Sequence, residues 1–152
     1  MKEISIEQWD RMMEILDFSP DCMLDTNCCG SDWCGGIRKY EYLSPELLEK
    51  LVEEGYADPE ECQNDSPTIQ EWLDFIKENP TLSNKISFHG YIVHKDRTDR
   101  RISIEGIQSS LILESIMNDV KFTEKEIEAI DFFCHYADEL SITENKLWVW
   151  YD

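Results

Sequence analysis

The chain has 152 residues, of which 33 are acidic and 14 basic, so its formal net charge at pH 7 is −19. This length suits one domain with its own core, and a hydrophobic content of 41% is too high for a disordered acidic tail. The negative charge disfavours direct binding to nucleic acid or to an anionic membrane, because both require a basic surface.

The first ten residues contain Glu3, Glu7 and Asp10 and no continuous apolar run, so we expect no signal peptide. No stretch reaches the roughly 20 apolar residues that a transmembrane helix needs. We therefore expect a cytoplasmic protein, in which the six cysteines are reduced.

In chain order, a capping box at Ser5 and Gln8 precedes apolar residues at helical spacing and predicts a helix over 6–17. Residues 18–36 are rich in Cys and Gly and are expected to form an irregular loop within the domain. Alternating residues predict a short strand over 37–43. Ser-Pro pairs at 44–45 and 66–67 predict helices over 45–54 and 67–78, because serine caps a helix and proline suits its first position.

Farther along, β-branched alternating segments predict a hairpin, with strands over 86–94 and 101–107. Residues 110–120 favour a helix, although a continued strand stays open. A capping box at Thr123 and Glu126 predicts a helix over 124–139, and residues 147–151 read as a strand. The predicted fold is α+β: a single compact domain over 1–152, with about four to five helices packed on a small, mostly antiparallel sheet.

Acidic residues are concentrated between Glu41 and Asp65, where nine acids accompany one base. On the predicted helix 45–54, like charges at positions i, i+3 and i+7 form a row opposite the leucines, an arrangement that costs a few tenths of a kcal/mol per pair. Such a face is either simply solvated, or it binds a basic partner by imitating the phosphates of a nucleic-acid strand. The candidate partner-binding residues are Glu46, Glu49, Glu53, Glu54, Asp58, Glu60 and Glu61.

The cysteine-rich loop is the candidate metal site. Cys29 and Cys34 are separated by four residues, which is within the range of zinc-binding pairs, and Cys22 and Cys28 would complete a tetrahedral set. The loop lacks a Cys-x-x-Cys pair and a second Cys or His pair at zinc-finger distance, so reduced structural cysteines are the alternative.

Groups suited to catalysis are few. His89 and His94 are expected on opposite faces of one strand unless a bulge at Gly90 intervenes, so they should not share a site. Cys134 and His135 are adjacent on a helix and point in different directions, which does not suit a nucleophile and its base. The sequence therefore favours a non-enzymatic protein.

Two further patterns have alternative interpretations. Arg97, Arg100 and Arg101 flank the hairpin turn and could hold an anion or pair with neighbouring acids. Trp148 and Trp150 share one face of the last strand while apolar residues fill the other, so this strand is either central in the sheet or has one face that binds something.

These observations predict an acidic, non-enzymatic protein-binding module. It would be an inhibitor or nucleic-acid mimic of the counter-defence or immunity type, engaging a basic groove of a partner such as a nucleic-acid-binding enzyme. The alternative is a zinc-binding or metal-dependent hydrolytic protein centred on the loop from Cys22 to Cys34.

Overall fold

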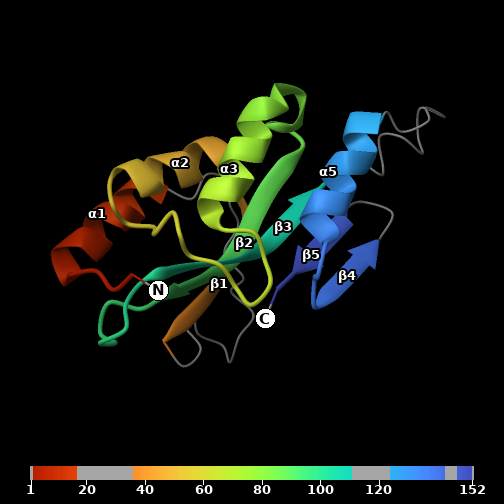
Figure 1. The fold of residues 1–152 in the computed structure, drawn as a ribbon. Coiled ribbons are helices and arrows are strands. Elements are labelled where there is room, and N and C mark those ends of the chain that lie inside the picture. The colour runs from red at the N-terminus through yellow and green to blue at the C-terminus, as the bar shows by residue number, and fades with distance from the viewer. Residues whose placement is uncertain (1, 17–35, 111–123, 143–146, 152) are drawn as a thin grey trace.

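The structure is a computed structural model, and it describes residues 2–16, 36–110, 124–142 and 147–151 (Figure 1). In chain order the described elements are α1 (Ile6–Leu16), β1 (Ile37–Leu43), α2 (Pro45–Glu53), α3 (Ile69–Glu78), the 3-10 helix η1 (Pro80–Leu82), β2 (Ile86–Val93), β3 (Ile102–Ser109), α5 (Glu124–Cys134), β4 (Glu139–Ile142) and β5 (Leu147–Trp150).

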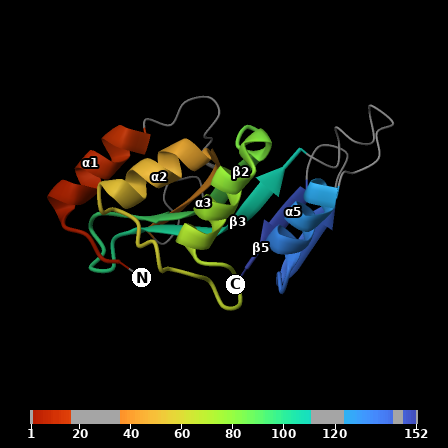
Figure 2. The ribbon, with the colours of Figure 1, turned by 45° about the horizontal axis from the view of Figure 1, so that its top comes forward.

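The described strands form one antiparallel sheet in the order β1-β2-β3-β5-β4. Strands β2 and β3 are the predicted hairpin, paired from Ile86 with Ser109 to Ile92 with Ile102. Helices α1, α2 and α3 lie side by side over one part of the sheet, and α5 lies beside β5 (Figures 1 and 2). The α+β prediction is confirmed, with four α-helices among the described residues.

The core lies between the helices and one face of the sheet. The ring of Trp72 on α3 lies 5.5 Å from that of Phe88 on β2 and 6.1 Å from that of Tyr151, measured between ring centroids. Side chains alternate along a strand, so His89 and Tyr91 lie on the face opposite to Phe88. One face of the sheet therefore packs on the helices, and His89 and Tyr91 belong to its other face.

Local capping explains where the helices begin. The Ser44 Oγ accepts a hydrogen bond from the Leu47 N–H at 3.2 Å, which caps α2 as predicted. In contrast, α3 begins at Ile69 and not at residue 67. Its N-cap is Thr68, whose capping box with Glu71 has hydrogen bonds of 3.1 and 2.8 Å. The reciprocal box satisfies two N–H groups at the helix start and so prevails over the Ser-Pro signal.

The prediction of a helix over 124–139 is wrong at its C-terminal end. Helix α5 ends at Cys134, and Tyr136 has a φ of 58°, in the left-handed region that a helix cannot continue through. The Tyr151 hydroxyl lies 2.7 Å from the Phe133 carbonyl oxygen and 3.0 Å from that of His135, so it satisfies carbonyls left by the end of the helix. Burial raises the pKa of Tyr151 to about 12.

Glu139, the last residue of the predicted helix, instead begins the edge strand β4, which runs to Ile142. Its pairing with β5 runs from Glu139 opposite Trp150 to Ile142 opposite Leu147. Strand β5 thus lies between β3 and β4, which confirms the interpretation of the tryptophan strand as an internal one.

Several sequence-based predictions concern segments outside the described residues. These are the loop over 18–36 except Gly36, the helix over 110–120 except Ser110, and the cap at Thr123. Among the residues that the structure describes, no helix combines the length and the apolar character needed to cross a bilayer.

Gly90 allows an aromatic side chain of β1 to reach across β2. The Tyr40 hydroxyl donates a hydrogen bond of 2.8 Å to the Ser103 carbonyl oxygen, although Gly90 of β2 lies between their strands. A Cβ at Gly90 would overlap that carbonyl and lie 2.9 Å from the Tyr40 hydroxyl oxygen. Strand register also shifts next to Tyr40 and at Gly90, so the crossing coincides with bulges in the sheet.

We expect Gly90→Ala to lower the free energy of unfolding by about 1–3 kcal/mol, because the added methyl group has no space beside backbone atoms. Urea denaturation of the full chain measures this change. Ser87→Ala, in the same strand, is the control and should change stability much less. A Gly90→Ala protein as stable as the wild type would show that the sheet has room at this position.

Candidate functional site

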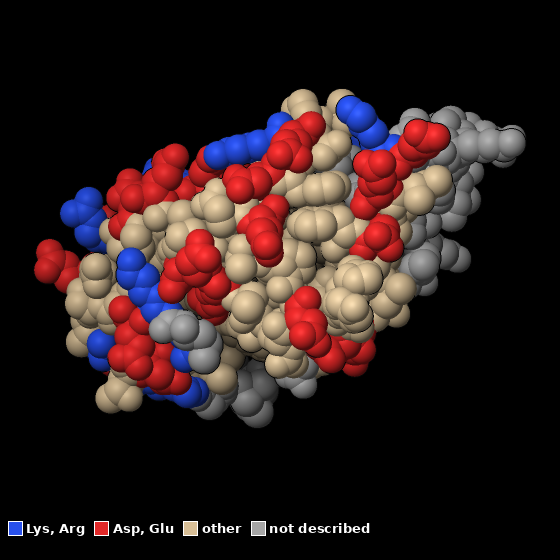
Figure 3. All heavy atoms as spheres, in the orientation of Figure 1, with Lys and Arg blue, Asp and Glu red and all other residues tan. Residues whose placement is uncertain are grey.

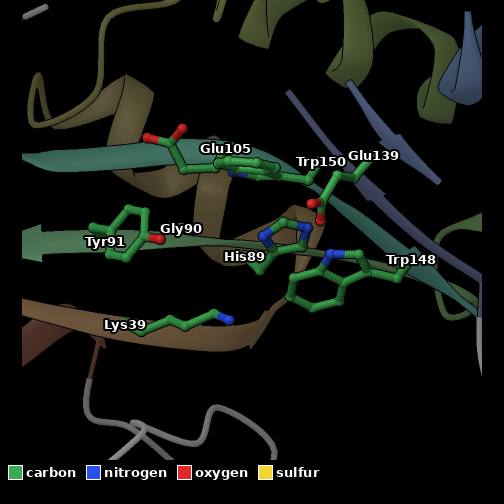
Figure 4. Close-up of a pocket in the computed structure, with 8 residues that line it drawn as sticks. All are labelled: Lys39, His89, Gly90, Tyr91, Glu105, Glu139, Trp148 and Trp150. Atoms are coloured by element: carbon green, nitrogen blue, oxygen red, sulfur yellow. The ribbon is translucent and has the colours of Figure 1, made fainter. Parts of the chain in front are cut away.

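A hollow of about 160 Å³ lies on the sheet, and all five described strands contribute to it (Figure 4). Its lining residues are Lys39, His89, Gly90, Tyr91, Glu105, Glu139, Trp148 and Trp150. Drug-sized ligands occupy roughly 300–1,000 Å³, whereas a cavity of about 150 Å³ holds one benzene-sized group. The hollow therefore has the size for the head of a single side chain.

Strand register places several of these residues in one row across the sheet. His89 is opposite Gly106, Gly106 is opposite Trp150, and Trp150 is opposite Glu139. Because Gly106 has no side chain, the His89 ring reaches over it, and Nε2 lies 2.7 Å from the Val149 carbonyl oxygen. A carbonyl oxygen only accepts, so His89 Nε2 carries the hydrogen.

The aromatic rings on this face are stacked. The rings of His89 and Trp148 are nearly parallel, with 3.6 Å between centroids and an interplanar angle of 8°. The Lys39 Nζ lies 5.1 Å from the centroid of the Trp148 ring, which is within cation–π distance. One side of the hollow thus already holds a cation of the chain itself.

The other side of the hollow combines an aromatic ring with carboxylates. Figure 4 shows Trp150 between Glu105 and Glu139, across the hollow from Lys39. Trp150 is half-buried and Glu139 is exposed. Glu105 accepts a hydrogen bond from the Ser103 hydroxyl. The hollow is therefore polarised, with a basic group on β1 and two acidic groups on β3 and β4.

A partly buried polar network connects Glu105 to the loop between α2 and α3. The Gln63 Nε2 lies 3.3 Å from the Ser103 Oγ and 3.5 Å from the Glu61 Oε1. Glu61 is only 8% exposed, and burial raises the pKa of its carboxyl despite the attraction of Arg101. Glu61 therefore does not belong to an exposed acidic row, contrary to the expectation from the sequence.

The remaining predicted partner-binding residues lie on α2 or in the loop between α2 and α3. Four of them are exposed, Glu46, Glu53, Glu54 and Glu60, and Asp58 is half-buried. Glu49 forms an ion pair with Lys77 of α3, which raises the pKa of that lysine. Figure 3 shows acidic side chains spread over the face in view, with other residues between them and basic side chains beside several of them.

The hairpin arginines pair with groups of the chain itself. Arg97 and Arg101 approach the Asp99 Oδ2 at 2.8 and 3.0 Å, and the hydrogen bond from Arg97 is the main cause that lowers the pKa of Asp99 to about 2. The Arg100 Nε donates to the Lys95 carbonyl oxygen at 2.9 Å. These contacts favour the internal-pairing interpretation of the arginines over an anion site.

The structure places two of the histidines considered for catalysis in different surroundings. His89 lines the hollow, whereas the ring of His94 packs 5.9 Å from that of Trp9, so the two histidines do not share a site. Burial raises the pKa of the Cys134 thiol, which disfavours the reactive thiolate.

No metal site is found in the part of the chain that the structure describes: it contains no group of three or more Cys, His, Asp or Glu side chains placed to hold an ion. The candidate zinc ligands Cys22, Cys28, Cys29 and Cys34 lie outside that part.

No protein-family model matches this chain, and the searches of curated proteins and of solved structures also found no match.

Sequence reasoning identified only part of the hollow. The shared face of Trp148 and Trp150 followed from strand alternation, but Lys39, Tyr91 and Glu105 were missed, and Glu139 was assigned to a helix. Alternation indicates which residues of one strand share a face, and it does not indicate which strands are neighbours.

The buried carboxyl of Glu61 gives a pH prediction. Its pKa is raised in the folded state, so the stability that its protonated form contributes is present at low pH and lost as the pH rises through the folded-state pKa. Glu61→Gln, which stays neutral, should raise the melting temperature at pH 7 and have little effect near pH 4.

Thermal unfolding at the two pH values measures this difference, with Glu60→Gln, an exposed neighbour, as the control. Equal effects of Glu61→Gln at both pH values would contradict a carboxyl that burial disfavours in its charged form.

Proposed function

We propose that this protein is an acidic protein-binding module that engages a basic groove of a partner protein and so excludes nucleic acid from it. The observation that carries the proposal is the charge of the helix layer. Helices α1, α2 and α3, together with Glu54 after α2, carry ten acidic residues against three basic ones. These helices lie side by side, so their charges act together on a partner (Figure 2).

The packing of α2 supports the proposal by fixing where its carboxylates point. Leu48 and Leu51 are completely buried against the core, while Glu46 and Glu53 are exposed. The Ser44 cap and the left-handed Gly55, with a φ of 82°, define the two ends of the helix. A partner would therefore meet carboxylates on a rigid element.

The spacing of these charges favours a general acidic surface over a close copy of a phosphate backbone. Glu46 and Glu53 are seven positions apart, which corresponds to about 10 Å along the helix axis. One DNA strand presents a phosphate about every 3.4 Å of axis. The carboxylates on α2 are thus more widely spaced than the phosphates of one DNA strand. Attraction to a basic groove would therefore come from the summed electrostatic field of the helix layer.

Glu49 contributes less to this surface than its neighbours, because its carboxylate already pairs with Lys77. Exposed ion pairs of this kind contribute little to stability, so the main effect of the pair is to reduce the net negative charge near Glu49. We assign partner contact chiefly to Glu46, Glu53 and Glu54.

Binding of this type has a defined salt dependence. Long-range attraction between opposite charges speeds association and is screened over about 8 Å at physiological ionic strength. We propose that the protein acts in the cytoplasm, where Cys62 and Cys134, both without a disulfide in the described residues, stay reduced.

The test is charge reversal on α2. Glu46→Lys with Glu53→Lys should abolish capture of a partner from extract of the native cell, and high salt should release the partner from the wild-type protein. The matched control is Glu128→Lys with Asp131→Lys, which changes the net charge equally on the exposed side of α5. The measurement is quantitative affinity capture at low and high salt.

Equal loss of capture in both double variants would show that binding depends on net charge alone. This result would contradict the assignment of partner binding to the α2 surface. Capture that survives the α2 reversal, or that resists high salt, would overturn the proposal. Circular dichroism of each variant establishes that the fold is retained.

The alternative function is a zinc-binding or metal-dependent hydrolytic protein, and it rests on the spacing of the cysteines alone. Elemental analysis of the purified protein separates the two proposals. Under the leading proposal we expect no stoichiometric zinc. One zinc per chain, lost in Cys29→Ser with Cys34→Ser, would favour the alternative, because thiolates of a structural site are required for binding.

A further inference from the structure

We propose that the hollow on the sheet binds the guanidinium group of an arginine side chain, stacked on the Trp150 ring and flanked by the carboxylates of Glu105 and Glu139. The hollow lies on the face of the sheet opposite to Phe88 and α3, and it shares no lining residue with the acidic helix layer. The binding site stands on this geometry alone. That the arginine belongs to a partner protein rests on the function proposed above.

The sign of the charge in the hollow favours a cation. Two carboxylates and one ammonium group line it, and the whole chain carries a net charge of −19. An anion would have to approach against this field, whereas a cation is attracted by it. The one Lys or Arg side chain in the lining, Lys39, lies over the Trp148 ring on the far side from Glu139.

The aromatic rings favour the same class of ligand. Indole faces attract cations through their quadrupole, and the Lys39 Nζ at 5.1 Å from the Trp148 centroid shows this interaction within the chain. Trp150 lies two residues along the same strand and therefore on the same face, next to Glu139 in the pairing of β4 with β5. It offers a second indole with a carboxylate beside it.

Shape distinguishes guanidinium from other cations. The hollow of about 160 Å³ admits one small head group and not a larger ligand. A guanidinium is flat, stacks on aromatic rings, and binds a carboxylate through two parallel hydrogen bonds. The half-buried Trp150 ring offers a flat surface in the hollow, on which a planar group fits better than a tetrahedral ammonium.

The site is also held rigidly. His89 is 1% exposed and is fixed by its hydrogen bond to the Val149 carbonyl oxygen, and Trp148 packs on its ring. Glu105 is linked through Ser103 to Gln63 in the loop after α2. A ligand would therefore meet groups already in place, which lowers the entropic cost of binding.

The test is titration of the full-length, nitrogen-15-labelled chain with Nα-acetyl-arginine amide, observed through the indole N–H signals. We expect saturable shifts of the Trp148 and Trp150 signals in the millimolar range and no shift for Trp72, which is 1% exposed in the core. Nα-acetyl-lysine amide and tetramethylammonium should bind more weakly, and acetate should not shift these signals.

Two variants locate the ligand. Trp150→Leu should abolish the titration, and Glu139→Gln should weaken it at least about fivefold, because a charge-assisted pair is lost. Glu139 is exposed, so its variant keeps the test valid if Trp150→Leu folds poorly. Glu128→Gln, an exposed acid on α5, is the matched control and should bind as the wild type does.

Absence of a saturable shift, or equal affinity in Glu139→Gln, would overturn the proposal. Tetramethylammonium that binds as tightly as the arginine probe would overturn the guanidinium assignment in favour of a small quaternary ligand. Partner capture that persists without arginine binding would overturn the site and leave the proposed function intact. Arginine binding without any salt-sensitive partner would support the site and overturn only the proposed function as the source of its ligand.

Discussion

The close approach of strands at two glycines is the constraint on which the rest of this structure depends. At Gly90 and Gly106 a Cβ would overlap a backbone carbonyl of the neighbouring strand, so only glycine fits. The absent side chains let Tyr40 reach Ser103 and His89 reach Val149. Each hydrogen bond ties a strand to its second neighbour, and the register shifts at these points bend the sheet.

The hollow is a consequence of the same constraint. Gly106 has no side chain, so the imidazole of His89 on the neighbouring strand lies across β3 at this position. The Trp148 ring then stacks on the imidazole. Trp150 then stands beside carboxylates from both neighbouring strands. An arrangement that satisfies backbone groups inside the sheet therefore also produces a concave aromatic surface on the face opposite to the helices.

The two faces of the molecule divide the charge differently. The helix layer presents dispersed carboxylates above a packed apolar core, which suits long-range attraction to a basic surface. The hollow presents two carboxylates around an indole, which suits recognition of one cationic group at short range. Attraction of a partner and recognition of one of its side chains would then be separate properties, open to separate mutation.

The sequence by itself determined the elements whose signals are local: the capped helices α1 and α2, the hairpin of β2 and β3, and the internal tryptophan strand β5. Tertiary structure decided what depends on contacts between distant residues. Strand β4 forms because it pairs with β5, α5 ends where Tyr151 meets its last carbonyls, and Glu61 is buried by the packing of its loop. The hollow depends on the order of all five described strands in the sheet. The periodicity of one segment does not indicate this order, because strand pairing depends on contacts across the whole sheet.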